Sequence, residues 1–398
     1  MSYKEVMMDV IRGSAAAFVP FAPRLDIWYR SNKLRGTLPD KYKNASLGDV
    51  IDDLQIGYNT MIPDFLEYDS ESDYIHRGIG LLTSATSNTH KVAFSNVDVT
   101  SEQTSKGLLV TYTTPFGKVS NITRLDDEMK SQGITAAAVV EHTIKSVDDY
   151  KAVQYIFENA QVLPDYDRFS RFQEKVGERG IAVCLGNLRE SGIRFINMEL
   201  MKYEDAVFGM FDHPDEFMSL RKTLDIFLDN LYDVAINSPA DVINVGAHFD
   251  ATLTPPPFFK KYVLPRLIKY SNAIHSKGKF MASHTDSENK GLLRYYIDSG
   301  MDIADSVCTK PLTSLDYNDI RCVTGNNLTL YGVIPSIATL ENSMSDYDFD
   351  HFLDELLCEI SDDGARNVIL SIADTTPPDA KFERVQRIAT LCRQVKPK

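Results

Sequence analysis

The feature that most constrains the fold is an alternation, from about residue 181 to the C-terminus, of short apolar runs with longer amphipathic stretches. Each run is continuous or nearly continuous in apolar residues, as expected of a strand covered on both faces. Alternation of such strands with helices is typical of a parallel sheet built from βα units. The predicted strands are residues 181–186, 240–248, 279–284, 301–306, 327–333 and 367–374.

The stretches between these runs have the periodicity of helices that bury one face. Residues 214–236 repeat phenylalanine and leucine at helical spacing, and residues 257–276 begin with a proline, which suits the first turn of a helix. Residues 346–360 and 379–392 follow the same rule. We therefore predict that strands and helices alternate through the C-terminal half of the chain.

Six strands of this kind leave two to be found upstream if the sheet closes into an eight-stranded barrel. The candidates are residues 59–67 and 134–142, where the pattern is weaker. Between them, residues 73–125 alternate with a period of two and carry turn residues, which is typical of antiparallel strands. We predict an α/β fold: a single (β/α)8 TIM-barrel domain over residues 1–398, with an N-terminal helical extension and an inserted antiparallel β segment at residues 73–125.

Composition and charge exclude several classes of partner. The chain carries 56 acidic against 42 basic side chains, a formal charge of −14, which would repel the phosphates of nucleic acids. No apolar stretch approaches the roughly 20 residues that a membrane-spanning helix needs. The cysteines form no CxxC pair, and no segment has the pattern of a secretory signal. We expect a cytoplasmic protein that binds neither nucleic acid nor a membrane.

Ionisable residues close three of the predicted strands, which is where the active site of a parallel βα fold lies. His248 and Asp250 end one strand, His284 and Asp286 end another, and Asp374 ends the last. Within each His/Asp pair, a spacing of two residues puts both side chains on the same side of an extended chain. Each pair could therefore face one pocket.

The nitrogen and oxygen donors of these residues suit either a divalent metal, with zinc as the first candidate, or general acid–base catalysis. We take His284, Asp286, His248 and Asp374 as candidate metal ligands, and His284, Asp250 and Asp286 as candidate catalytic residues. The alternative is structural, because an aspartate at a strand end can cap the next helix and a histidine there can be a hydrogen-bonded core residue.

A second group of candidates lies near the N-terminus, where Arg24, Arg30 and Arg35 accompany the single tryptophan, Trp28. Guanidinium groups bind carboxylates or phosphates through paired hydrogen bonds. We therefore take the three arginines, together with His248, as candidate substrate-binding residues. A solvated basic face on a pair of N-terminal helices is the alternative.

The stretch from residue 241 to residue 393 resembles the C-terminal half of the uroporphyrinogen decarboxylase superfamily. Three segments carry the likeness in the family's order, namely PPPFFKKYVLPRL, IHSKGKFMASHTD and NVILSIADTTPPDAKFERV. Upstream, IWYRSNKLRGTLPDKY is similar to the arginine-rich segment of the decarboxylases, although its spacing is longer and the glutamine–alanine–glycine core is lost.

This superfamily contains cofactor-free decarboxylases of tetrapyrrole synthesis and zinc-dependent methyltransferases that exchange a methyl group with a corrinoid protein. The methyltransferase branch looks closer, because the arginine motif that grips the decarboxylase substrate is degraded here. In its coenzyme M methyltransferases, zinc is bound by H-x-C and a distal cysteine, which fall on His284, Asp286 and Asp374. Since aspartate replaces both cysteines, the chain looks like the O-demethylase group, which uses a nitrogen and oxygen zinc sphere.

The resemblance thus implies a methyltransferase that moves a methyl group from a small donor, such as an aryl methyl ether, to the Co(I) of a separate corrinoid protein, assisted by zinc. A cofactor-free decarboxylase is the alternative, with Arg24, Arg30 and Arg35 as clamps for carboxylates. A third interpretation is a barrel that binds a corrinoid protein or a small ligand without turnover. The sequence leaves a homodimer open.

Overall fold

A six-stranded parallel sheet lies at the centre of the computed structural model, which describes residues 1–14, 16–63, 71–82 and 86–395. Strands that follow one another in the sequence are neighbours in this sheet. All six predicted strands are confirmed, as β7 (Val183–Asn187), β8 (Val242–Ala247), β9 (Phe280–His284), β10 (Ile303–Val307), β11 (Thr329–Pro335) and β12 (Val368–Ala373). Nearly all their residues are buried, which explains why the apolar runs are continuous.

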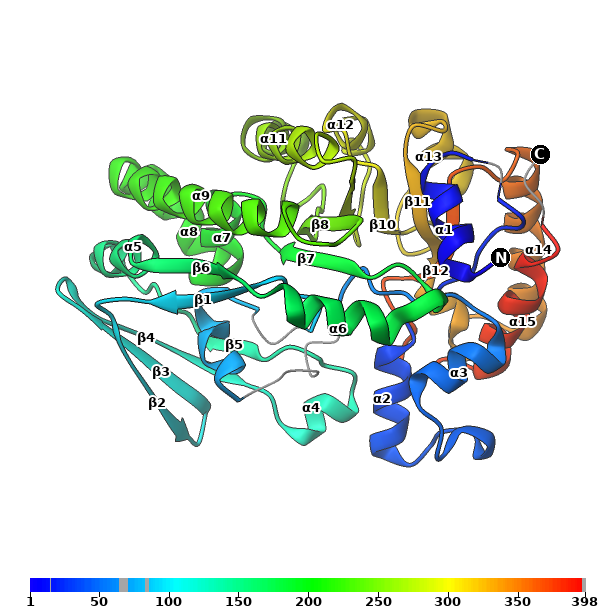
Figure 1. Ribbon diagram of the computed structural model, residues 1–398, viewed down its shortest axis with the longest axis horizontal. Coiled ribbons are helices and arrows are strands. Elements are labelled where there is room, and N and C mark those ends of the chain that lie inside the picture. The colour runs from blue at the N-terminus through cyan, green and yellow to red at the C-terminus, as the bar shows by residue number, and fades with distance from the viewer. Residues whose placement is uncertain (15, 64–70, 83–85, 396–398) are drawn as a thin grey trace.

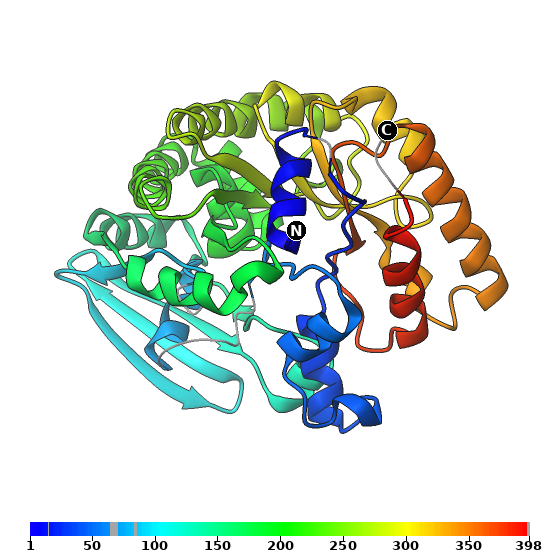
Figure 2. The ribbon, with the colours of Figure 1, turned by 45° about the vertical axis from the view of Figure 1, so that its right-hand side comes forward.

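Helices surround the parallel sheet, as Figures 1 and 2 show. The long helix α9 (Pro214–Ile236) follows β7 after a detour through α7 (Gly192–Phe195), η5 (Ile196–Leu200) and α8 (Tyr203–Asp212). The later connections contain α10 (Pro256–Phe258), η6 (Phe259–Val263), α11 (Leu264–His275), α12 (Leu293–Asp298), α13 (Tyr317–Thr324), η7 (Ser336–Thr339), α14 (Asp346–Asp362) and α15 (Phe382–Cys392). The four predicted helices are thereby confirmed. No helix in the described ranges is both long and apolar enough to cross a membrane.

Both edges of the parallel sheet carry hydrogen bonds to the N-terminal part of the chain. At β12, the N–H of Ala22 donates to the carbonyl of Leu370 over 2.8 Å. At the other edge, next to β7, the N–H of Tyr58 donates to the carbonyl of Arg179, also over 2.8 Å. The N–H of Gly57 in turn donates to the carbonyl of Phe21 at 2.8 Å, so these two N-terminal segments are linked to each other.

The N-terminal helices occupy two different places. The side chains of α1 (Tyr3–Ile11) pack on residues at the beginnings of the parallel strands, such as Val242 and Ile369, and Figure 2 shows α1 near the centre of the ring of helices. Helices α2 (Asp26–Arg35), η1 (Asp40–Tyr42) and α3 (Leu47–Leu54) lie to one side of the sheet (Figure 1). The amino-terminal end of the sheet is thus covered by α1, which leaves chemistry to the carboxyl-terminal end.

Antiparallel strands form a separate layer on the left of Figure 1. One sheet has the order β2 (Asp98–Thr104), β3 (Gly107–Thr114), β4 (Gly117–Arg124) and β5 (Ala138–Glu141), and a second pairs β1 (His90–Phe94) with β6 (Ala160–Pro164). The remaining elements of this part of the chain are η2 (Glu71–Ile79), α4 (Asp127–Ser131), η3 (Val147–Asp149), α5 (Tyr150–Glu158), α6 (Tyr166–Val176) and η4 (Gly177–Arg179). The predicted antiparallel character of this region is confirmed.

One predicted strand belongs to the other sheet. Residues 134–142 were expected in the parallel sheet, but β5 lies within them and pairs antiparallel with β4, with Val139 opposite Thr123. The expectation was wrong because a four-residue strand with two exposed positions is half-buried, and a short apolar run does not reveal which sheet covers it. Of the other candidate, residues 59–67, the last four lie outside the described residues, and residues 59–63 form no regular strand.

Candidate functional site

Two histidines and an aspartate meet at the carboxyl ends of β8 and β9. His248, His284 and Asp286 each offer a ligand atom, and these atoms all lie within 4.8 Å of one another. His284 is the last residue of β9 and stands in register with Ala247 of β8 and Asp305 of β10. The parallel register therefore brings together side chains that the sequence places on separate strands, and this trio could hold a metal ion.

The imidazole of His284 lies among three carboxylates. Its Nδ1 is 2.6 Å from Oδ2 of Asp305, and its Nε2 is 3.1 Å from Oδ1 of Asp374 and 3.5 Å from Oδ2 of Asp286. Burial opposes the charged form, but Asp286 and Asp374 outweigh it and hold the pKa of His284 well above its ordinary value. The neighbouring carboxylates thus favour the protonated form of this imidazole.

The pKa of His248 is shifted in the opposite direction to that of His284. Its Nδ1 lies 2.8 Å from Oδ2 of Asp286, and its ring stands nearly perpendicular to that of His284, with 5.3 Å between the ring centres. Burial lowers the pKa of His248, and Asp286 only partly offsets this effect. The two histidines are thus pushed towards opposite protonation states, a pattern that is common where acid–base or metal chemistry takes place.

Asp374 and Arg24 reach the trio from the other edge of the sheet. The trio together with Asp305, Asp374 and Arg24 is called the cluster. Asp374 follows β12, and its Oδ1 is 3.6 Å from Nη1 of Arg24, whose side chain is buried and also lies beside Asp26. His284, with Arg24 behind it, lowers the pKa of Asp374 although burial alone would raise it. Of the three predicted arginines, Arg24 is the one that reaches the cluster.

Asp250 stands in the loop after β8 rather than in the trio. Its Oδ1 accepts hydrogen bonds from the N–H groups of Thr252 and Leu253, at 2.8 and 2.9 Å, and its Oδ2 accepts one from the N–H of Glu288 at 3.3 Å. Glu288 itself accepts from the N–H of Ser314 at 2.8 Å. These two carboxylates join the loops that follow β8, β9 and β10, so the structure gives Asp250 a loop-organising position.

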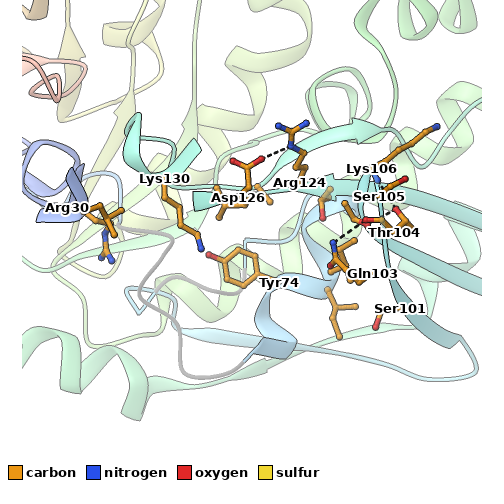
Figure 3. A pocket seen from close by; sticks show the side chains of 17 residues that line it. Arg30, Tyr74, Ser101, Gln103, Thr104, Ser105, Lys106, Arg124, Asp126 and Lys130 are labelled. Carbon is orange, nitrogen blue, oxygen red and sulfur yellow. Dashed lines mark hydrogen bonds and ion pairs between the residues drawn. The ribbon is translucent and has the colours of Figure 1, made fainter. Parts of the chain in front are cut away.

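Arg35 and Arg30 lie away from the cluster. Arg35 forms an ion pair with Asp379 at 2.6 Å and donates to the carbonyl of Ser131. Arg30 lines a cavity of about 1090 Å³ between α2 and the antiparallel sheet. Figure 3 shows this cavity, with Lys130 and Tyr74 pointing towards one another across it. The cluster residues do not line it, so it is a separate feature.

Asp305 was not among the candidates named from the sequence. It is the last ionisable residue of the predicted strand at residues 301–306, and that position was the available signal. Cys308 lies near the cluster, and burial raises the pKa of its thiol to about 12. Four buried charged residues follow β7 in a stretch that carries no recognisable motif, namely Arg189, Glu190, Arg194 and Glu199.

The comparisons with known proteins bear on the fold. No model of a known protein family matches the chain, and no curated protein does so either. Among solved structures, it is similar to a methyltransferase from Methanosarcina mazei, with a TM-score of 0.55 and 15% sequence identity. The alignment covers 99% of this chain and 98% of that one. The two proteins therefore share a fold from end to end.

Proposed function

We propose that this protein is a methyltransferase that takes a methyl group from a small donor, an aryl methyl ether being the first candidate, and transfers it to the Co(I) of a corrinoid protein with the assistance of a bound zinc ion. The observation that carries the proposal is the trio of His248, His284 and Asp286 at the carboxyl ends of the strands. The fold shared with a methyltransferase and the resemblance of residues 241–393 to the corrinoid-dependent branch support the type of reaction.

The residues present fit a divalent cation. The three carboxylates of Asp286, Asp305 and Asp374 surround one imidazole, and Oδ1 of Asp286 is buried with no hydrogen-bond partner among the described residues. A divalent cation that replaces the proton of His284 would add positive charge among these carboxylates, and imidazole with carboxylate is a donor set that zinc accepts. His284, His248 and Asp286 would hold the ion, with Asp374 as a fourth donor.

Asp305 would act on the ion through His284. Because the Nδ1 of His284 faces Asp305, the Nε2 atom is left to point towards Asp286 and Asp374. A carboxylate behind a ligating histidine fixes its tautomer and its orientation.

The chemistry requires the bond between the methyl carbon and the donor oxygen to break while the carbon–cobalt bond forms, with the electron pair left on oxygen. A bound zinc ion would stabilise that oxygen as a Lewis acid. His284 is buried, whereas the side chains of His248 and Asp374 are 39% and 37% exposed, so a donor would reach the ion from their side. Arg24 adds a buried positive charge beside Asp374 that would attract an oxyanion.

We infer that the sheet closes into a (β/α)8 barrel around this site. The hydrogen bonds of Ala22 to Leu370, of Gly57 to Phe21 and of Tyr58 to Arg179 would join the two edges of the six-stranded sheet through two further short strands. Closure would place Arg24 beside Asp374 at the carboxyl end of the barrel, where the active sites of such folds lie.

A cofactor-free decarboxylase is the second candidate, favoured by the same position of Arg24. A buried guanidinium within 3.6 Å of a carboxylate could bind the carboxyl group of a substrate instead. Such an enzyme would keep its activity after exhaustive chelation.

The test is the metal content of the protein purified without chelator, followed by a methyl-transfer assay with methoxylated aromatics and reduced cobalamin. We expect roughly one zinc ion per chain. His284→Ala should lose the zinc and the activity, whereas His275→Ala, a matched change at a half-exposed histidine that pairs with Asp302, should keep both. Methyl transfer that survives exhaustive chelation would reject the assistance by zinc. Absence of zinc and of methyl transfer, together with release of CO2 from a carboxylic acid substrate, would favour the decarboxylase.

A further inference from the structure

Arg194 is a fully buried cation that the proposed chemistry does not use. It lies on α7, between β7 and α9, and 1% of its side chain is exposed. The charge is balanced by Glu190, whose Oε2 lies 3.3 Å from Nε of Arg194. Because burying an ion pair of this kind rarely adds stability over apolar packing, its presence calls for another explanation.

The guanidinium spans the loop that carries His248. Its Nη1 donates to Oγ1 of Thr254 at 2.6 Å, and its Nη2 donates to the carbonyls of Ala247 and His248 at 2.5 and 3.1 Å. The same group lies over the ring of Phe249, 5.1 Å from its centre. One side chain thereby contacts both ends of the segment from residue 247 to residue 254.

His248 needs such support because its backbone is in the left-handed region, with φ of 57°. For a residue with a side chain of this size, that conformation costs about 1 kcal/mol or more. Both of its peptide groups are held: the N–H donates to the carbonyl of His284 at 2.9 Å, and the carbonyl accepts from Arg194. The imidazole reaches Asp286 from this backbone conformation.

We propose that Arg194 is a positioning residue that holds His248 in the conformation in which its imidazole meets Asp286 and completes the trio. The consequence for metal binding rests on the proposed function, whereas the consequence for the position of His248 does not.

The experiment compares Arg194→Met and Arg194→Lys with Arg321→Met. Arg321 is a matched control, since it is also buried and donates to the backbone carbonyls of Gly325, Arg366 and Asn367, near the opposite end of the sheet. Three quantities are measured: the melting temperature, the zinc affinity by competition with a chromophoric chelator, and the crystal structure of the metal-free protein.

We expect Arg194→Met to weaken zinc binding by about 10- to 100-fold and to separate His248 from Asp286 in the crystal structure. Arg194→Lys should restore part of the affinity, because a single ammonium group cannot reach Thr254 and the two carbonyls together. Arg321→Met should lower the melting temperature but leave the affinity and the His248–Asp286 contact unchanged.

An unchanged contact between His248 and Asp286 in folded Arg194→Met would overturn the proposal. If Arg194→Met does not fold, an Arg194→Lys variant with both wild-type zinc affinity and an unchanged contact would overturn it. If the wild-type protein binds no zinc, the proposed function fails, and the crystal structures still decide whether Arg194 holds His248.

Discussion

The Nδ1 atom of His284 lies 2.6 Å from Oδ2 of Asp305, across two adjacent parallel strands in register. Both side chains are buried, at 1% and 3% exposure. This contact orients the imidazole so that its second nitrogen faces Asp286 and Asp374. The candidate site therefore depends on a residue that does not belong to the proposed ligand set.

Replacing Asp305 by asparagine should weaken zinc binding and reduce turnover, each by about 10- to 100-fold, because the histidine loses the carboxylate that fixes its orientation. Zinc affinity by competition and initial rates measure the two effects. Asp302→Asn is the matched control, since Asp302 pairs with His275 at 2.8 Å near the opposite end of the sheet. Equal zinc affinity in Asp305→Asn and the wild type would contradict this role.

Replacing Asp250 by alanine should destabilise the protein without removing the metal. The change leaves the N–H groups of Thr252, Leu253 and Glu288 without their acceptor, and we expect the free energy of unfolding to fall by about 1–2 kcal/mol. Urea denaturation and zinc content measure the two quantities. A variant of wild-type stability that has lost all turnover would instead show that Asp250 is catalytic, as the sequence predicts.

Glu199→Gln should be among the most destabilising single changes in this chain. Arg77 and Arg189 contact the two oxygens of Glu199 at 2.7 and 2.8 Å, and the side chain of Glu199 is 3% exposed. Removing the carboxylate leaves two guanidinium groups uncompensated, which costs about 3–5 kcal/mol. Glu141→Gln, which breaks an exposed pair with Lys106, is the control and should change the urea midpoint little. Similar midpoints for the two variants would reject this expectation.

Stability should decline in acid partly because of His90. Burial lowers the pKa of His90 to about 4, and Arg168 adds to the effect while Asp165 opposes it. The unfolded chain, with a pKa near 6.5, binds this proton first, so stability is fully present above about pH 6.5 and is lost as the pH falls towards 4. The loss from this residue reaches about 3 kcal/mol.

Urea denaturation from pH 7 to pH 4 tests this expectation. The free energy of unfolding should fall less steeply with acid in His90→Gln than in the wild type, because the variant has no proton to take up at this position. Parallel pH profiles for the two proteins would show that His90 titrates normally in the folded state.

Local pattern was sufficient for the parallel sheet and for part of the site. The six runs of apolar residues predicted β7 to β12, because strands buried on both faces carry few polar residues. His284 with Asp286, two residues apart at the end of one strand, was likewise visible. These features depend on the side of the strand to which neighbouring side chains point, and the spacing of residues in the sequence determines that side.

Tertiary structure alone decided which distant residues meet. Residues 134–142 contain the antiparallel strand β5 because β5 pairs with β4. Which strand becomes its partner depends on the packing of the whole chain. Among Arg24, Arg30 and Arg35, the position of the chain beside β12 brought only Arg24 to Asp374. Asp305 and Arg194 joined the site through strand register and a loop contact, which arise from residues far apart in the sequence and leave no local pattern.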